Sequence, residues 1–190
     1  IDAIVARETS GMSRDQKYLR GLFTGGTLTD ESATLLYDDL GGIFSFDASD
    51  PAFKLADPPK SPGHTIVGLC EDVFTVGRPH PMIDPSIRTE RMDQEAEDGE
   101  MAVMLLDCVI GYGSHPDPAG AMVPSIEKAK KAAASRGGYL SVVASVTGTD
   151  GDFQGLSDQR RKLEAAGVVV MPTNYQATML VRRMMDRRSK

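Results

Sequence analysis

The sequence contains no tryptophan, only two cysteines and no apolar run long enough to cross a bilayer. A membrane-spanning helix needs about 20 consecutive apolar residues, and no signal peptide opens the chain, so we expect a cytoplasmic protein. Both Cys70 and Cys108 lie in apolar, strand-like runs, and we interpret them as buried free thiols rather than a disulfide. The three histidines and two cysteines show no zinc-ligand spacing, so no metal site is predicted.

The chain also lacks an excess of positive charge. Lysine and arginine number 21 against 27 aspartates and glutamates, which argues against a nucleic-acid partner because phosphate binding needs a basic surface. We interpret the basic cluster near the carboxyl terminus as a solvated face. It comprises Arg182, Arg183, Arg187, Arg188 and Lys190. With 41% hydrophobic and 25% charged residues over 190 positions, the composition is that of one globular domain.

Several nucleotide and hydrolase motifs are missing. The sequence has no Gly-x-x-x-x-Gly-Lys-Ser/Thr loop and no Gly-x-Ser-x-Gly elbow, which argues against a P-loop enzyme and a serine hydrolase. The run Gly111-Tyr112-Gly113 begins like a dinucleotide fingerprint, but Pro116 occupies the place of the third glycine. A standard Rossmann cofactor is therefore not expected.

What the chain does contain is an alternation of short apolar runs with amphipathic stretches. This pattern predicts an α/β domain with a mainly parallel five-stranded sheet and helices on both faces. The predicted strands cover residues 18–23, 64–69 (continued by 73–76), 101–106, 139–146 and 168–171. The predicted helices cover residues 28–40, 85–97, 119–135, 156–166 and 174–185.

The pattern also divides the chain. We expect a polar lead-in over 1–17, the α/β domain over 18–185 and a basic tail over 186–190, with 41–63 a long surface excursion. Thr27 or Thr29 is the expected cap of the first helix, and Asp84 that of the helix that Pro85 opens.

Ligands of open parallel sheets bind outside the carboxyl ends of the strands, where loops lead into helix N-termini. Every predicted strand end here carries Gly or small hydroxyl residues, and three add charged or imidazole groups. Our candidates for binding a substrate or anion are Gly25, Gly26, Thr27, Arg88, Gly111, Gly113, His115, Asp117, Thr147, Gly148, Thr149 and Asn174. His80 and Arg78 are the catalytic candidates, because prolines on both sides stiffen the backbone around His80.

Each candidate also has a structural alternative. Arg78 and Arg88 could clamp a carboxylate or phosphate, or form ion pairs with Asp84, Glu90 or another local acid. Glycine turns occur in any α/β fold, and His115 could be an ordinary loop histidine. Asp117 could simply cap a helix.

Two longer motifs resemble known proteins. The run from Gly25 to Ala33, GGTLTDESA, resembles the Ser-Gly-Thr-Leu-Thr-Tyr-Glu-Ala motif of the succinyl-CoA synthetase α subunit, whose ligase domain is shared with ATP-citrate lyase. The string from Gly77 to Pro85, GRPHPMIDP, is similar to the carboxy-terminal half of FdrA proteins, described as predicted acyl-CoA synthetases. The resemblance implies a flavodoxin-like, succinyl-CoA-synthetase-like domain over about residues 18–185.

The same resemblance implies partners that the chain does not itself contain. FdrA proteins carry a preceding nucleotide-fold half, and the chain here begins at Ile1 rather than Met, which suggests a fragment. No cofactor is assigned to this chain, and CoA or a nucleotide would be bound by that amino-terminal half. We expect a small anionic substrate, with other subunits or a homo-oligomer, and no membrane partner.

Two departures from the ligases concern the mechanism. Their phosphorylated histidine lies in a Gly-His-Ala-Gly loop, whereas here residues 147–156 connect directly to the next helix. Their supporting glutamate corresponds to Val109, which cannot accept a hydrogen bond from an imidazole. A phosphohistidine relay is therefore not expected.

Three hypotheses follow. The first is a subunit of an acyl- or carbamoyl-transferring complex of the oxamate carbamoyltransferase type, in purine or allantoin catabolism, as the FdrA resemblance implies. The second is an ATP-dependent acyl-CoA synthetase that uses His80. The third is a non-catalytic scaffold or regulatory subunit.

Overall fold

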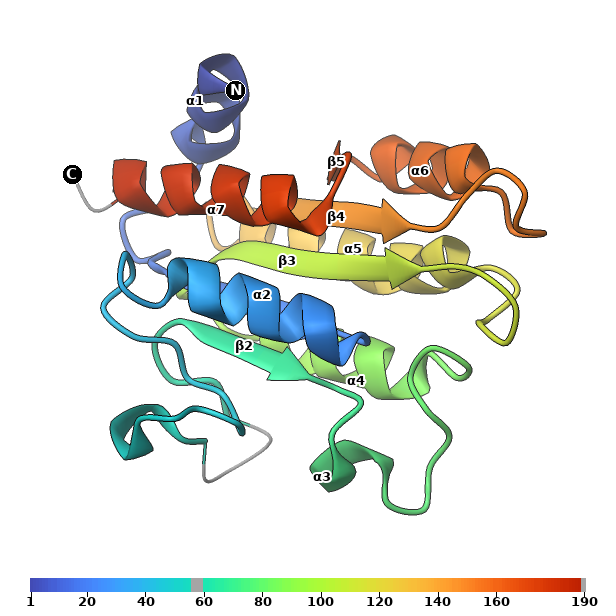
Figure 1. Cartoon of the computed structure of the whole chain (residues 1–190). Helices are drawn as coiled ribbons and strands as arrows, with labels where there is room; N and C mark the ends of the chain where they lie inside the picture. Colours follow the sequence, from blue (N-terminus) through green and yellow to red (C-terminus); the bar gives the residue numbers. More distant parts are fainter. Residues whose placement is uncertain (56–59, 189–190) are drawn as a thin grey trace.

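The computed structural model describes residues 1–55 and 60–188, and its centre is a five-stranded sheet (Figure 1). The strands run in the order β2-β1-β3-β4-β5, and every neighbouring pair is parallel. Their bounds are β1 Tyr18–Phe23, β2 Thr65–Gly68, β3 Met101–Val109, β4 Ser141–Thr147 and β5 Val169–Met171. The predicted five-stranded α/β architecture is thus confirmed, and the sheet is parallel throughout.

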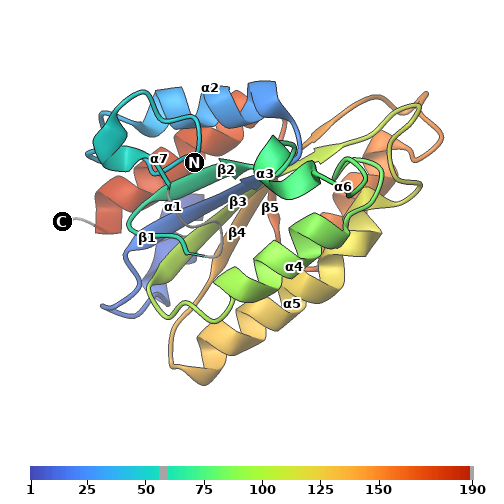
Figure 2. The same ribbon diagram turned by 90° about the horizontal axis from the view of Figure 1, so that it is seen from below.

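Helices cover both faces of this sheet (Figure 2). One face carries α1 (Asp2–Ser10), α2 (Gly26–Leu36) and α7 (Asn174–Arg188), and the other carries α4 (Ser86–Glu95), α5 (Pro118–Ser135) and α6 (Leu156–Ala165). Strand β3 supplies both cores, because its side chains alternate between the two faces. A strand buried on both faces is a continuous apolar run, which is why this strand was readily predicted.

Strand direction places the loops that matter for a ligand. Since all strands are parallel, their carboxyl ends meet along one side of the sheet, which we call the carboxyl edge, and the opposite side is the amino edge. The chain leaves β1 through α2 to β2 on one side, and later returns to β3 on the other side of β1. The gap between the carboxyl ends of β1 and β3 is therefore the topological switch point, where ligands of such sheets bind.

The element boundaries correct some predictions. Residues 1–17 were expected to be a polar lead-in without an assigned structure, and they contain α1, whose Glu8 accepts hydrogen bonds from Tyr139 and Ser141. Residues 73–76 do not continue the second strand, because 72–75 form the short helix α3 (Asp72–Thr75). Helix α7 continues through Arg188, so 186–188 are helical, while Lys190 and the end of the expected tail lie outside the described residues.

The excursion at 41–63 is more ordered than predicted. It includes the short 3-10 helix η1 (Pro51–Phe53), and Ile43 and Leu55 are buried. Residues 56–59 lie outside the described part of the chain. In the described residues, no helix combines the length and apolar character that crossing a bilayer requires.

Candidate functional site

A buried carboxylate fixes the turn between β1 and α2. Asp107, near the end of β3 and fully buried, accepts hydrogen bonds from the backbone amides of Thr24 and Gly25, at 2.9 Å each. It also accepts from the Thr24 hydroxyl at 3.0 Å and forms an ion pair with Arg88 at 2.7 Å. A charge this deeply buried is tolerated because it is both paired and hydrogen-bonded. Asp107 therefore connects β3 to the β1–α2 turn at the switch point.

This geometry changes the expected role of two candidates. Gly25 was expected to offer its amide to an anion, but that amide donates to Asp107. Arg88 was expected to clamp a substrate or to pair with Asp84, Glu90 or another local acid, but it is 2% exposed and pairs with Asp107, which is distant in the chain. The sequence could not indicate this pair, because Arg88 lies on α4 and Asp107 on β3, and only the folded structure brings the two side chains together.

The first turn of α2 remains open. Gly25 is its N-cap and no side chain caps the helix, so the prediction of Thr27 or Thr29 as cap is wrong; Thr29 Oγ1 donates to the Gly25 carbonyl instead. Gly26 and Thr27 are exposed, whereas Gly25 is buried. The first amides of a helix lack intrahelical acceptors and carry a partial positive charge. The exposed start of α2 is thus suited to an anion.

Two residues beside this turn were not predicted as site residues. A Cβ placed on Gly26 would lie 3.8 Å from Cys70 Sγ, and one placed on Gly68 would lie 3.1 Å from Glu71 Oε1 and 3.3 Å from Thr29 Oγ1. Cys70 is half-buried rather than buried as expected, whereas Cys108 is buried, and both are free thiols. Burial and nearby acids, with Glu71 first among these, raise the pKa of Cys70, so its thiolate is disfavoured.

Glu71 has a strongly displaced pKa. Burial, followed by the charges of Asp47 and Asp30, raises the pKa of its carboxyl group to about 7, although a hydrogen bond with the Gly68 backbone opposes the shift. A carboxyl group that exchanges its proton near neutral pH is suited to general acid–base chemistry. No sequence motif marks Glu71, because its pKa depends on acids that are distant in the chain.

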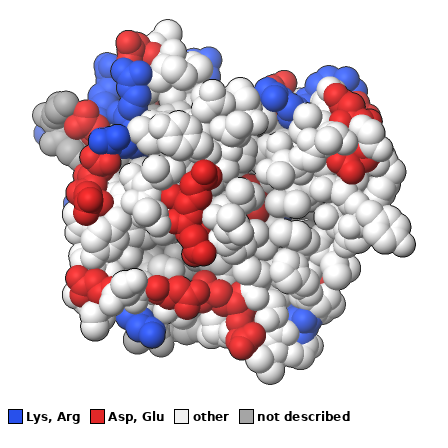
Figure 3. All heavy atoms as spheres, viewed as in Figure 1, with Lys and Arg blue, Asp and Glu red and all other residues white. Residues whose placement is uncertain are grey.

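A cavity of about 530 Å³ adjoins this part of the edge, between α2 and the segment that follows it. Ala33, Tyr37 and Ile43 form the apolar part of its lining. Its acidic lining residues are Asp30, Asp38, Asp47 and Asp50, and the described lining includes no lysine or arginine. Figure 3 shows acidic side chains gathered on the face that carries α2. The cavity therefore favours an uncharged or cationic group, next to a helix start that favours an anion.

The turn after β4 was the second expected anion cradle. Here the amide of Thr149 donates to Asp152 at 2.6 Å, so the protein's own carboxylate already uses it. Gly148 has φ +152°, and a Cβ there would lie 2.1 Å from Ile110, so a side chain does not fit. Thr147 is exposed at the end of β4. In both expected anion-binding turns, after β1 and after β4, one backbone amide therefore already donates to a carboxylate of the protein itself.

Three loops of the carboxyl edge, residues 77–85, 110–117 and 147–155, are tied together, and we call them the loop ridge. The His115 amide donates to the Met82 carbonyl at 2.7 Å. Gln154, 5% exposed, exchanges hydrogen bonds with the Gly111 backbone and donates to the His115 carbonyl. Gly113, with φ +87°, lies exposed in the middle loop. The ridge therefore brings together loops that follow three different strands or helices.

The charged candidates of the ridge have structural partners. Arg78 forms a two-pronged pair with Glu90, at 2.8 and 2.9 Å, on the surface. Asp117 caps α5 by accepting from Gly120 and also pairs with Lys162 at 2.7 Å. Arg78 therefore does not form a common clamp with Arg88, which lies buried against Asp107.

All three histidines use the same ring nitrogen as an acceptor. Nδ1 of His80 accepts from the Met82 amide, Nδ1 of His115 from the Asp117 amide, and Nδ1 of His64 from the Leu19 amide. In a neutral imidazole with this bond, the proton is on Nε2, so the ring has no second lone pair for nucleophilic attack. The absence of a phosphohistidine relay stays a prediction.

Asn174, the first residue of α7, was expected to bind an anion. Its amide nitrogen instead donates to the Leu28 carbonyl, to Glu31 and to Ser32, all on α2. It is 5% exposed. Its role in the structure is to join the starts of α7 and α2.

A family model described as CoA-ligase matches residues 22–184 of the chain. The chain belongs to the CoA-ligase family. Among curated proteins, it is 41% identical over 179 residues to the Escherichia coli (strain K12) protein described as "Uncharacterized protein YahF". That match covers 94% of this chain and 35% of YahF, so the chain spans about a third of the relative's length.

Solved structures show the same fold. A dinucleotide-forming acetyl-coenzyme A synthetase 1 from Ca. Korarchaeum cryptofilum, in its apo form, matches with TM-score 0.56 and 14% identity, over 99% of this chain and 38% of its own. PH0766 from Pyrococcus horikoshii OT3 matches with TM-score 0.54 and 12% identity, over 96% and 40%. Together, the family match and the fold place the chain in the acyl-CoA-ligase-like superfamily.

Proposed function

We propose that the chain is an acyl- or carbamoyl-transfer domain that binds a small acyl phosphate at the first turn of α2 and uses no phosphohistidine of its own. The observation that carries this proposal is the buried Asp107, which holds the β1–α2 turn, while the next two residues, Gly26 and Thr27, are exposed. The position at the switch point and the uncapped helix start both support an anion there.

The proposed chemistry is a direct transfer. The nucleophilic atom of the acceptor bonds to the acyl carbon as the bond between that carbon and the phosphate oxygen breaks. The phosphate leaves with its charge stabilised by the α2 amides, and the proton of the nucleophile passes to the Glu71 carboxylate. A pKa of about 7 allows Glu71 to accept this proton and release it again near neutral pH.

CoA and nucleotides fit this part of the edge poorly. Both are polyanions, whereas the cavity beside α2 is lined by four aspartates. We therefore derive no step through either group, and assign their binding to the additional part of longer relatives. The FdrA resemblance supports carbamoyl phosphate as the first substrate to test.

Binding of acetyl phosphate and carbamoyl phosphate by isothermal titration calorimetry tests the proposal. Gly26→Asp places a carboxylate at the first helical position, which should compete with the anion and weaken binding at least ~10-fold, or about 1.4 kcal/mol. Gly26→Ala is the matched control and should bind as the wild type does, since a Cβ there meets nothing closer than Cys70 Sγ at 3.8 Å. Equal binding by Gly26→Asp and wild type would refute the site.

Two alternatives have distinct outcomes. An ATP-dependent synthetase that uses His80 predicts an acid-labile phosphate label that disappears in His80→Asn. The orientation of His80, with Nδ1 as acceptor, disfavours that result. A scaffold without catalysis predicts that Glu71→Gln leaves turnover of carbamoyl phosphate by the assembled complex unchanged, whereas our proposal predicts loss of turnover with binding retained.

A further inference from the structure

Exposed large apolar side chains gather at the carboxyl edge. Of the seven among the described residues, only Ile1 lies elsewhere. The other six all follow the carboxyl end of a strand, and they are Val73, Val76, Ile83, Tyr112, Phe153 and Tyr175. Single exposed apolar residues are ordinary, but a group of them on one edge is typical of a contact surface.

Three of these side chains project from the loop ridge, one from each loop. Ile83 is 58% exposed, Phe153 is 67% exposed, and Tyr112 is exposed fully. The loops that carry them are held by Gln154 and by the bond from His115 to Met82. Because the backbone is fixed, ordering these side chains against a partner costs little conformational entropy. Aromatic residues on rigid supports commonly dominate binding energy in protein interfaces.

The charge of the ridge restricts its partner. It contains one arginine against four aspartates; Arg78 is paired with Glu90 and Asp117 with Lys162, which leaves Asp84, Asp150 and Asp152 without an ion pair among the described residues. Asp150 and Asp152 bond to Ser157 and to the Thr149 backbone and are not paired with a lysine or arginine in the described structure. A surface with lysine or arginine around its rim would therefore complement the ridge.

We propose that the loop ridge is the docking surface of a companion protein domain, apolar at its centre and basic at its rim. The relatives supply a reason to expect one, because the chain covers 35% of YahF and 38–40% of the two similar structures. A second copy of this chain pairing ridge to ridge would place aspartates against aspartates, which disfavours that occupant. The proposal concerns a protein contact and does not depend on acyl phosphate binding.

Amide hydrogen exchange tests the proposal. The 190-residue chain replaces the matched segment of full-length YahF, and exchange at 110–117 and 147–155 is compared with that of the chain alone. We expect exchange at least ~10-fold slower in the fusion. The double variant Tyr112→Ser/Phe153→Ser should remove this protection, because it deletes both aromatic contacts. Tyr175→Ser, an exposed tyrosine outside the ridge, is the matched control and should retain it.

The same variants in the isolated chain distinguish a companion domain from a second copy of the chain as the partner of the loop ridge. Both substituted side chains are exposed, so the double variant should fold with unchanged thermal stability. A dimer of the wild-type chain that the double variant abolishes, measured by light scattering, would replace the companion domain with a second copy and overturn the proposal. If the fusion does not fold, the chain is co-expressed with the rest of YahF, and co-elution that requires Tyr112 and Phe153 is expected. Unchanged exchange in the fusion, or no co-elution of the pair, also overturns it.

Discussion

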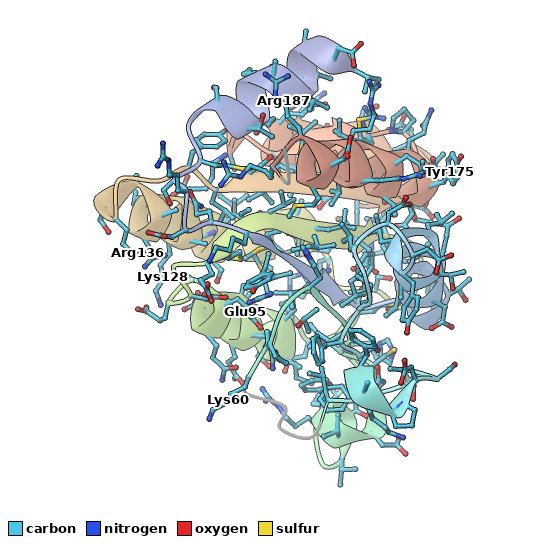
Figure 4. The ribbon with its side chains drawn as sticks, turned by 90° about the vertical axis from the view of Figure 1, so that its left-hand side faces the viewer. Lys60, Glu95, Lys128, Arg136, Tyr175 and Arg187 are labelled. Carbon is cyan, nitrogen blue, oxygen red and sulfur yellow. The ribbon has the colours of Figure 1, made fainter. Side chains whose placement is uncertain are left out.

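The two edges of the sheet both contain buried arginine–carboxylate pairs, but the pairs do different things. At the amino edge, Arg20 bonds to Glu95 at 3.0 Å and also pairs with Asp98, while Arg91 bonds to Glu95 at 2.8 Å. Figure 4 shows Glu95 beneath the strands at this edge. At the carboxyl edge, Asp107 pairs with Arg88. Its carboxylate also accepts hydrogen bonds from the backbone amides of Thr24 and Gly25 in the β1–α2 turn.

The difference concerns what each network leaves exposed. The amino-edge network joins side chains to one another and to the 61–63 backbone, and Arg20, Glu95 and Asp98 also line a cavity of about 430 Å³. The carboxyl-edge pair fixes a turn after which Gly26 and Thr27 are exposed. Both pairs are part of the folded core, but by our account only the second supports a binding site.

The largest effect is expected from Asp107→Ala. This substitution leaves the Arg88 charge buried without its partner and releases the Thr24 and Gly25 amides, so we expect a loss of about 3–5 kcal/mol in unfolding free energy. Urea denaturation measures it. Asp93→Ala removes an exposed pair with Lys128 and should cost less than about 1 kcal/mol. A loss below 1 kcal/mol for Asp107→Ala would contradict the role assigned to it.

Glu95→Ala should have the next largest effect. Arg20 and Arg91 lose a shared carboxylate, but Asp98 still pairs with Arg20, so we expect about 3 kcal/mol. Anion binding should be unchanged in the folded fraction, because this network is at the opposite edge. Weakened acyl phosphate binding in calorimetry, with the protein folded, would mean that the edges are not independent.

Smaller effects should appear in the pH dependence of stability, with opposite signs at the two edges. Burial, followed by the charge of Arg20, lowers the pKa of His64 to about 4 from an ordinary value of 6.5. The contribution of His64 to the free energy of unfolding is therefore fully present above pH 6.5 and is lost as pH falls towards 4. The pKa of Glu71 is raised from 4.5 to about 7, so its contribution is present below pH 4.5 and is lost as pH rises through 7.

Unfolding curves measured between pH 4 and 8 can separate the contributions of His64 and Glu71 to the pH dependence of stability. His64→Asn should reduce the loss of stability on the acid side, and Glu71→Gln should reduce the loss between pH 4.5 and 7. Because Glu71 is partly exposed, we expect less than about 1 kcal/mol from it after solvent screening. Identical pH profiles for wild type and Glu71→Gln would show that its carboxyl group is not perturbed.

Gly26→Ala should have the smallest effect. A helical glycine costs about 0.5–1 kcal/mol relative to alanine, and the new Cβ meets only Cys70 Sγ at 3.8 Å. We therefore expect a gain of about this size in thermal or urea unfolding. A loss of stability would mean that the start of α2 does not accept a side chain.

Sequence reasoning predicted the fold well because hydrophobic periodicity reports burial. Strand β1 was predicted with its observed bounds, and the apolar run 101–106, which forms most of β3, was placed correctly in the centre of the sheet. Helix α1 was missed because its apolar face is weak and it is held by the buried polar group Glu8.

The candidate site was harder to predict because its geometry comes from contacts between distant segments. The strand-end rule located the edge, but it could not reveal that Asp107 uses the Gly25 amide, or that Asp152 uses the Thr149 amide. Glu71 carries no motif, and its pKa depends on Asp47 and Asp30. The roles of His80, Arg78 and the other candidates in catalysis stay predictions.

The most direct measurement follows individual amides by ¹⁵N–¹H NMR during titration with carbamoyl phosphate or acetyl phosphate. We predict saturable shifts at Gly26 and Thr27 in the wild type, their loss in Gly26→Asp and their retention in Gly26→Ala. Saturable shifts confined to the 77–85 loop around Arg78 and His80, with none at the start of α2, would contradict this prediction.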